Sequence, residues 1–220
     1  MNIGRTKIVE TKDAVADFLA CFERLFAHGD FFTLNVSSPN TPNLRDLQEK
    51  KLLRELLGAV QEKNRSLAAH ARIEPKPVLV KIAPDMEFSQ VDEILEVVES
   101  VRLTGIVATN ATAFMRENLK SPHGREPGGL SGRPITAKVT SFVAHIYKQT
   151  NGQLPIIGVG GIFNAADAYE KIKAGASAVQ IYTGWIYEGP GAVKRINQGL
   201  AGLLERDGLK HISEAVGIQS

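Results

Sequence analysis

The stretch Val78-Leu79-Val80-Lys81-Ile82-Ala83 is almost continuously apolar and contains several β-branched residues. Such a run is typical of a strand buried on both faces of a parallel sheet, because a strand with one wet face would alternate apolar and polar residues. Comparable short runs occupy residues 32–37, 105–110, 155–161 and 178–183, and residues 2–4 could be the tail of another. These segments are the predicted strands of one sheet.

Segments with apolar residues at helical spacing separate the predicted strands. The first contains Val15, Phe18, Leu19 and Phe22, and Gly29 ends it; the others lie at residues 53–60, 91–98, 135–146, 168–172 and 192–204. A strict alternation of short strands and helices predicts parallel strands covered by helices. Two architectures fit this pattern, a closed (β/α)8 barrel and an open doubly wound sheet.

The glycines after the last two predicted strands favour the barrel. Residues 158–164 resemble a dinucleotide-binding fingerprint, but Phe163 occupies the position of its third glycine. The segment instead predicts a strand, a glycine turn and Asn164 as the cap of the next helix. A second turn is predicted at Tyr182-Thr183-Gly184. Two successive glycine-rich strand exits match the phosphate site of a barrel.

The number of strands is too small for a complete barrel. A barrel has eight strands and typically about 250 residues, whereas this chain has 220 residues and five full strand signals. Either the protein is an open half-barrel or the chain lacks the N-terminal part, and an unprotected parallel edge disfavours the first option. We therefore expect an α/β protein with an incomplete (β/α)8 TIM barrel that lacks its first strands, forming one domain over residues 1–220.

Composition excludes several other functions. The chain is 43% hydrophobic and 23% charged with a net charge of +2, which gives no electrostatic case for nucleic acid. Cys21 is the only cysteine, so an internal disulfide is excluded. The five histidines show no metal-binding spacing, and no apolar run is long enough to cross a bilayer.

Polar side chains follow the predicted strand at residues 32–37. Asn35, Ser38 and Asn40 lie in a stretch that Pro39 and Pro42 stiffen, because proline fixes φ and removes a donor. Parallel α/β folds place their chemistry at such strand exits. A simple turn with Asx and serine caps explains this segment equally well.

The next two strands also end in hydrogen-bond donors. Lys81 interrupts an apolar strand, where an ammonium is costly unless it meets an anion or snorkels to solvent. Thr109, Asn110 and Thr112 end the following strand in polar groups, although ordinary helix capping also explains a Thr-Asn pair. Together the three exits predict a donor-rich site without an acidic pair or a Ser-His-Asp set, which suits a carbonyl-rich ligand and a redox cofactor.

The loop at residues 121–134 is longer than most β–α connections, which is typical of lids and binding loops. Its Gly-Gly-Leu-Ser-Gly-Arg-Pro segment at 128–134 favours an ordered loop whose backbone approaches another group closely. A disordered excursion is the alternative.

Six motifs stand in order along the chain: Asn-Val-Ser-Ser-Pro-Asn-Thr at 35–41, Val-Lys-Ile-Ala-Pro-Asp at 80–85, Ala-Thr-Asn at 108–110, Gly-Gly-Leu-Ser-Gly-Arg-Pro at 128–134, Ile-Ile-Gly-Val-Gly-Gly-Ile at 156–162 and Gln-Ile-Tyr-Thr-Gly at 180–184. Together they resemble the dihydroorotate dehydrogenase family, in its quinone-dependent class. The class depends on Ser38, because the soluble class usually has cysteine there.

The resemblance implies an FMN-containing barrel that oxidises (S)-dihydroorotate to orotate in pyrimidine (UMP) biosynthesis and passes electrons to a quinone. It implies that Ser38 is the catalytic base for the C5 proton. Asn35, Asn40 and Asn110 would bind the substrate, with Asn35 also touching the flavin, and Lys81 would lie beside the N1–O2 side of the flavin.

Further cofactor contacts follow from the same resemblance. Asn2 and Thr109 would contact the isoalloxazine, and the ribityl phosphate would bind to Gly132, Gly161, Tyr182 and Thr183. Ala111 stands where the family usually has threonine, so its substrate contact would run through the backbone or a shifted neighbour.

The class also implies peripheral association with the bacterial cytoplasmic membrane or the mitochondrial inner membrane, through N-terminal helices without a counterpart in this sequence. On this resemblance the chain corresponds to the C-terminal two-thirds of the enzyme. The alternative is a non-catalytic or folding-deficient flavin- or phosphate-binding barrel fragment.

Overall fold

The computed structural model describes residues 1–117 and 119–219. Within them, one six-stranded sheet has all its strands parallel and in the order β1-β2-β3-β4-β5-β6. The strands are β1 (Asn2–Gly4), β2 (Phe32–Asn35), β3 (Val78–Ile82), β4 (Gly105–Ala108), β5 (Ile156–Val159) and β6 (Ala178–Gln180). A doubly wound sheet reverses its order at a switch point, and this one does not. The predicted barrel architecture is therefore confirmed, as a partial barrel whose edges are β1 and β6.

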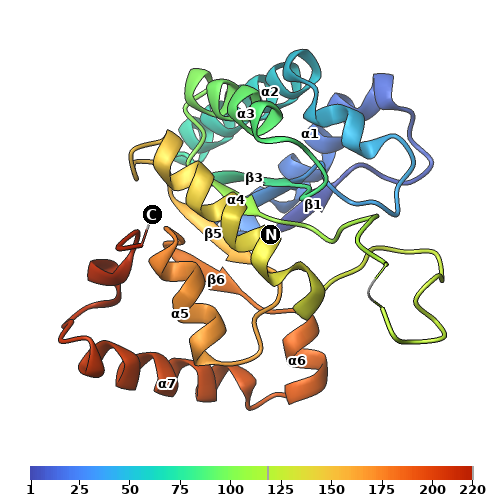
Figure 1. Cartoon of the computed structure of the whole chain (residues 1–220). Coiled ribbons are helices and arrows are strands. Elements are labelled where there is room, and N and C mark those ends of the chain that lie inside the picture. Colours follow the sequence, from blue (N-terminus) through green and yellow to red (C-terminus); the bar gives the residue numbers. More distant parts are fainter. Residues whose placement is uncertain (118, 220) are drawn as a thin grey trace.

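Helices follow every strand and lie around the outside of the curved sheet (Figure 1). They are α1 (Ala14–Leu25), α2 (Lys50–Ala71), α3 (Phe88–Ser100), α4 (Thr136–Gln149), α5 (Ala165–Lys173), α6 (Thr183–Glu188) and α7 (Ala192–Arg206). Short 3-10 turns occur at Thr11–Asp13, Phe26–His28, Leu44–Gln48, Arg133–Ile135 and Ile212–Ala215. None of the helices in the described ranges is both long and apolar enough to span a bilayer.

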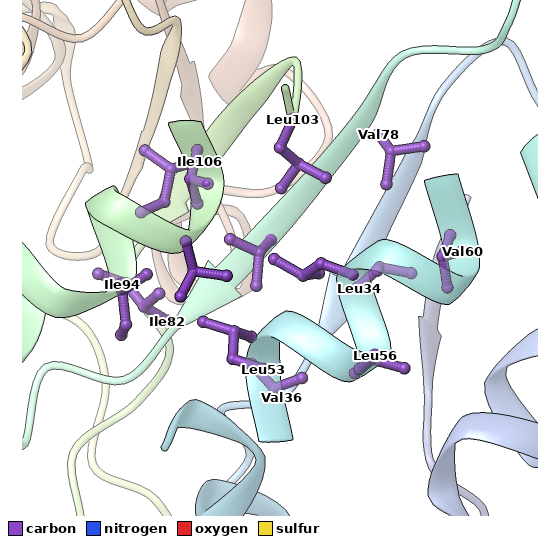
Figure 2. Close-up of a cluster of buried hydrophobic side chains, with 14 of the residues drawn as sticks. Leu34, Val36, Leu53, Leu56, Val60, Val78, Ile82, Ile94, Leu103 and Ile106 are labelled. Atoms are coloured by element: carbon purple, nitrogen blue, oxygen red, sulfur yellow. The ribbon is translucent and has the colours of Figure 1, made fainter. Parts of the chain in front are cut away.

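The main core lies between the sheet and its helices. Figure 2 shows Leu53, Leu56 and Val60 of α2 directed toward side chains of the sheet such as Leu34, and all four are fully buried. Burying a side chain of this size contributes about 1.5–3 kcal/mol. This layer fixes the helices to the convex face of the sheet.

Strand β3 is buried on both faces, as its sequence predicts. Val78, Val80 and Ile82 belong to the helix-facing core, whereas Leu79 joins a smaller cluster with Val107 and Val159 on the concave face. Because side chains alternate along a strand, Lys81 shares the concave face with Leu79. The sheet therefore points its only β3 cation toward the inside of the barrel.

All five predicted strands end earlier than the runs that predicted them, and β5 also begins one residue later. The run at 32–37 leaves the sheet after Asn35, whose Oδ1 accepts the Ser37 N–H at 3.2 Å. The glycine turn predicted at Tyr182–Gly184 is wrong, since α6 begins at Thr183. Gly184 allows the helix to pack there, because a Cβ on it would lie 2.1 Å from the Ile162 carbonyl oxygen.

The predicted helix cap at Asn164 is confirmed. Its Oδ1 accepts the Asp167 N–H at 3.0 Å, and Asp167 Oδ2 accepts the Asn164 N–H at 3.3 Å. This reciprocal capping box satisfies donors that a helix start otherwise leaves unpaired. It fixes the point at which the chain turns from β5 into α5.

Lys171 of α5 is a fully buried cation that the sequence did not predict. Its Nζ donates to Thr140 Oγ1 at 3.0 Å and to the Thr136 carbonyl at 3.4 Å, and no carboxylate pairs with it among the described residues. Desolvation by burial lowers the pKa of Lys171 to about 8. The ammonium thus destabilises the folded state at neutral pH.

We expect Lys171→Met to raise the free energy of unfolding at pH 7 by about 1–2 kcal/mol. The unfolded chain binds more protons between pH 8 and the ordinary lysine pKa of 10.5, so the wild-type protein gains stability as pH rises through that window. The variant should lack this gain. Denaturant unfolding from pH 7 to pH 10 measures both effects, with the exposed Lys194→Met as control; equal pH slopes for wild type and Lys171→Met would contradict the prediction.

Candidate functional site

A cavity of about 780 Å³ lies at the carboxyl ends of the strands, a size typical of small-molecule sites. Thr112, which the sequence placed at the same strand exit as Asn110, is fully buried and does not line it. Every position to which the resemblance assigns a role does line it: Asn2, Asn35, Ser38, Asn40, Lys81, Thr109, Asn110, Ala111, Gly132, Gly161, Tyr182 and Thr183. The structure therefore brings these twelve residues together. Their individual roles stay predictions.

Strand register explains why the polar side chains meet. Asn35 of β2 is paired with Lys81 of β3, and Lys81 with Val107 of β4. Side chains at paired positions of parallel strands project from the same face. Asn35 and Lys81 therefore both point into the concave side, and Thr109, just after the end of β4, lines the same cavity.

A hydrogen-bonded cluster joins the ends of β2 and β4. Asn35 Oδ1 accepts from Ser37 Oγ at 3.0 Å and from Asn110 Nδ2 at 3.2 Å, and Asn110 Nδ2 also donates to Ser37 Oγ at 3.0 Å. Ser37 is fully buried and was not predicted as a site residue. The Asn-x-Ser spacing, which suits an Asx turn, was the signal that could have found it.

Ser38 lies one residue further along, half-buried at the cavity wall. Its Oγ accepts the Asn40 N–H at 3.3 Å, which closes a small serine turn. The turn interpretation of this segment is thus correct, and the same turn presents Ser38 and Asn40 to the cavity. The Asn40 side chain has no hydrogen-bond partner in the described part of the chain.

Lys81 is half-buried, and its ammonium has no protein acceptor within residues 1–117 and 119–219. Desolvation by burial lowers the pKa of Lys81 below its ordinary value. The described lining includes no carboxylate, imidazole or thiol, and no described group of three His, Cys, Asp or Glu side chains could hold a metal ion. The cavity therefore favours an anionic or carbonyl-rich ligand.

The opposite wall consists of backbone held close by glycines. Gly161 has φ +73°, and a Cβ on it would lie 1.8 Å from Thr136 Oγ1. Gly132 has φ +84° and packs against Thr183, while Ser131 Oγ and Thr183 Oγ1 form a hydrogen bond of 2.7 Å. Because no side chain separates the backbone of such glycines from the cavity, a wall of this kind suits a phosphate, which main-chain N–H groups can bind.

The long loop closes over the serine turn. Its Leu130 pairs with Thr112 through two backbone hydrogen bonds, 2.8 and 3.0 Å long. A Cβ on Gly129 would lie 2.7 Å from the Ala111 Cβ and 2.9 Å from the Pro39 Cγ. The predicted close backbone approach of this loop is therefore present.

The backbone N–H and carbonyl of Ala111 already have hydrogen-bond partners within the protein, and its side chain is a methyl group. Its N–H donates to Asn110 Oδ1 at 2.8 Å, and its carbonyl accepts from Arg45 at 3.0 Å. A ligand contact through this backbone would have to share these bonds.

Sequence reasoning also missed other residues of the lining. Gly129 and Ser131 lie within the glycine-rich loop that the motif search quoted, and Gln180 ends β6 at the opposite edge of the sheet. Their place in recognised motifs was available as a signal, but the partner of Ser131 is 52 residues away in sequence. Such long-range pairs depend on the fold.

An open (β/α) barrel with a donor-lined cavity at its carboxyl edge and glycines after its last strands places the chain among (β/α) barrel proteins, whose small-molecule sites lie at this edge. The family model for dihydroorotate dehydrogenase matches residues 2–204. The chain belongs to the dihydroorotate dehydrogenase family. The resemblance seen in the motifs is confirmed.

Relatives with similar sequences belong to the same family. The chain is 48% identical over 217 residues to a dihydroorotate dehydrogenase (quinone) from Gloeobacter violaceus, covering 99% of this chain and 59% of that protein. It is 47% identical over 217 residues to the enzyme of the same name from Anaeromyxobacter sp., covering 99% and 58%. The chain thus spans somewhat under three fifths of the length of these relatives.

Two crystal structures of the Eimeria tenella protein share this fold. The one in complex with ferulenol has a TM-score of 0.94 at 36% identity, covering 99% of this chain and 60% of that chain. The ligand-free one has a TM-score of 0.91 at 37% identity, covering 98% and 62%. This chain therefore corresponds to about three fifths of the length of those two chains.

Gly161→Ala should destabilise the protein by about 1–3 kcal/mol, because alanine is strained at positive φ and its methyl group would collide with Thr136. Gly202→Ala in α7 is the matched control, since a Cβ there meets nothing within 4 Å. That control should be neutral or stabilise by up to about 1 kcal/mol. Denaturant unfolding measures both, and an unchanged midpoint for Gly161→Ala would contradict the close packing.

Proposed function

We propose that residues 1–220 form one FMN-binding domain, part of a dihydroorotate dehydrogenase that oxidises (S)-dihydroorotate to orotate in UMP biosynthesis with a quinone as acceptor. The observation that carries this proposal is the convergence of Ser38, Lys81 and Asn110, from three successive strand exits, on one cavity. The names of the relatives support the reaction and the acceptor.

The lining fits FMN. The glycine wall at Gly132 and Gly161, with Tyr182 and Thr183, suits the ribityl phosphate, and the unpaired Lys81 ammonium suits the electron-rich N1–O2 side of the ring. Asn2 and Thr109 also line the cavity, and we expect them to contact the isoalloxazine ring. When bound, FMN supplies the acceptor for the hydride that leaves C6 of the substrate.

The substrate would lie against the amides. Asn40 and Asn110 present donors and acceptors to its carbonyl and carboxylate groups, and Asn35, with its Oδ1 already used, offers its amide N–H groups. Ser38 would remove the proton from C5. Because the described lining holds no carboxylate or imidazole to assist Ser38, water in the cavity is the natural acceptor for its proton.

The quinone acceptor and the membrane location are proposed from the names of the relatives. Peripheral association with a membrane, bacterial cytoplasmic or mitochondrial inner, follows from the quinone named in the relatives. Its support is this name, because the lining of the cavity concerns only the flavin half-reaction.

Anaerobic mixing of the FMN-loaded protein with dihydroorotate tests the central claim. Bleaching of the flavin absorbance, with stoichiometric formation of orotate, is expected. A protein that binds FMN but is not bleached would favour the second candidate, a barrel fragment that binds flavin or phosphate without turnover. The open edges at β1 and β6 favour that candidate, since an unclosed barrel holds its interior less firmly.

Ser38→Ala should slow flavin reduction by dihydroorotate by about 10²–10⁴-fold, the usual contribution of a positioned base, with FMN still bound. Stopped-flow absorbance gives the rate, and quenching of FMN fluorescence gives the affinity. Ser141→Ala on the outer face of α4 is the control. Loss of FMN from Ser38→Ala would instead make Ser38 a structural residue.

Lys81→Met should have opposite effects on the empty and the loaded protein. The FMN-free variant should unfold at a higher denaturant concentration at pH 7, because a buried ammonium with a lowered pKa is removed. FMN should bind about tenfold or more weakly, since a charge-assisted hydrogen bond contributes about 1.5–3 kcal/mol. A surface lysine such as Lys194 should change neither quantity, and a Lys81 variant that behaves like it would refute this role.

A further inference from the structure

The guanidinium of Arg45 joins three strand exits at once. Its Nε donates to the Ser37 carbonyl at 3.2 Å, one terminal nitrogen to Asp85 Oδ2 at 2.8 Å, and the other to the Ala111 carbonyl at 3.0 Å. Ser37 precedes Ser38, and Ala111 follows Asn110. Each nitrogen of one planar group thus holds a different segment beside the cavity.

Asp85 extends the contact into the loop after β4. Its carboxylate accepts the Thr112 hydroxyl through Oδ1 and the Ala113 N–H at 2.7 Å through Oδ2. Thr112 in turn is paired with Leu130 of the glycine-rich loop. The network therefore connects the serine turn, the exits of β3 and β4, and the loop that covers them.

Neither charged side chain lines the cavity. The Asp85 side chain is 2% exposed and that of Arg45 is 24% exposed, so the pair is largely shielded from water. A shielded pair with three hydrogen bonds from its guanidinium holds its geometry, because removing one partner leaves the other charge uncompensated. The pair can act on a ligand only through the segments that it holds.

The far end of the serine turn has an independent anchor. Arg5, buried just after β1, donates to the Pro42 carbonyl and, at 2.8 Å, to Thr11 Oγ1. The turn is thus fixed at Ser37 by Arg45 and at Pro42 by Arg5. Only Arg45 also fixes the neighbouring exits of β3 and β4.

We propose that Arg45 and Asp85 are positioning residues that set Ser38 in register with Asn110 and Lys81 for proton removal. The inference rests on the proposed function, since it names what holds the base of that reaction. A displacement of about 1 Å at a reacting group can slow a reaction about 10²-fold. Loss of the clamp should therefore lower the rate of the chemical step more than it lowers ligand binding.

Arg45→Lys tests the three-way contact most directly, because it changes the hydrogen-bonding geometry and keeps the charge. Lysine keeps a positive charge beside Asp85 but has one nitrogen, which cannot reach three divergent acceptors. In the FMN-loaded protein at saturating dihydroorotate, we expect flavin reduction to slow at least about tenfold while FMN affinity stays within about threefold. Asp92→Asn, which changes a carboxylate on the outer helix layer, is the control.

Hydrogen exchange supplies a readout that needs no turnover. In FMN-free Arg45→Lys, the amides of Asn40 and Ala113 should exchange faster than in wild type, because their acceptors Ser38 Oγ and Asp85 Oδ2 lose their support. Amides in the middle of α7 should not change. Protection unchanged at both Asn40 and Ala113 would overturn the clamp, whether or not dihydroorotate is the substrate.

Thr112 provides a second route if changes at Arg45 or Asp85 prevent folding. Thr112→Val removes the hydroxyl that donates to Asp85, and Thr112→Ser keeps it. The valine variant should show the slowed reduction and the serine variant should restore it. A lowered melting temperature with an unchanged reduction rate in Arg45→Lys and Thr112→Val would overturn the inference, whereas failure of wild type to reduce flavin would refute only the proposed function.

Discussion

Parallel pairing of six strands in sequential order is the constraint on which the site depends. It sends every strand exit to the same edge, so residues 75 positions apart, such as Asn35 and Asn110, come within hydrogen-bond distance. It also fixes which face each side chain takes. A shift of β3 by one residue would turn Lys81 into the helix-facing core and Val80 or Ile82 into the cavity. The apolar contacts of α2 and the chemistry of the concave face are thus set by one register.

The sequence predicts those features whose signals are local. Continuous apolar runs locate the strands, helical spacing locates the helices that cover them, and Asn164 caps α5 as its position suggests. Lys81 could be singled out because a charge inside an apolar strand is unusual at the level of sequence alone. The sequential order of the strands could be predicted only indirectly, because the glycines after the last two strands favour a barrel and a barrel has its strands in sequential order.

Features that depend on distant partners could not be predicted in this way. Arg45 and Asp85 look like ordinary loop charges until the fold places them 2.8 Å apart. Lys171 follows Glu170 in a helix that also contains Asp167 and Lys173, so the sequence gives no sign that its ammonium will be enclosed by α4. The start of α6 at Thr183 depends on Gly184 fitting against the Ile162 carbonyl. From the sequence alone, a glycine at this position indicates a simple turn as readily as a helix that packs closely against the backbone.

The cavity also connects the two edges of the sheet. Asn2 on β1 and Gln180 on β6 both line it, although these strands lie at opposite ends of the strand order. Any strand that paired with either edge would therefore stand beside the cavity and add to its wall. Ligand binding and edge pairing would then stabilise each other, because each favours the same closed arrangement of the rim. The shape of the cavity and the pairing of the sheet edges therefore depend on the same geometry, because both β1 and β6 line the cavity.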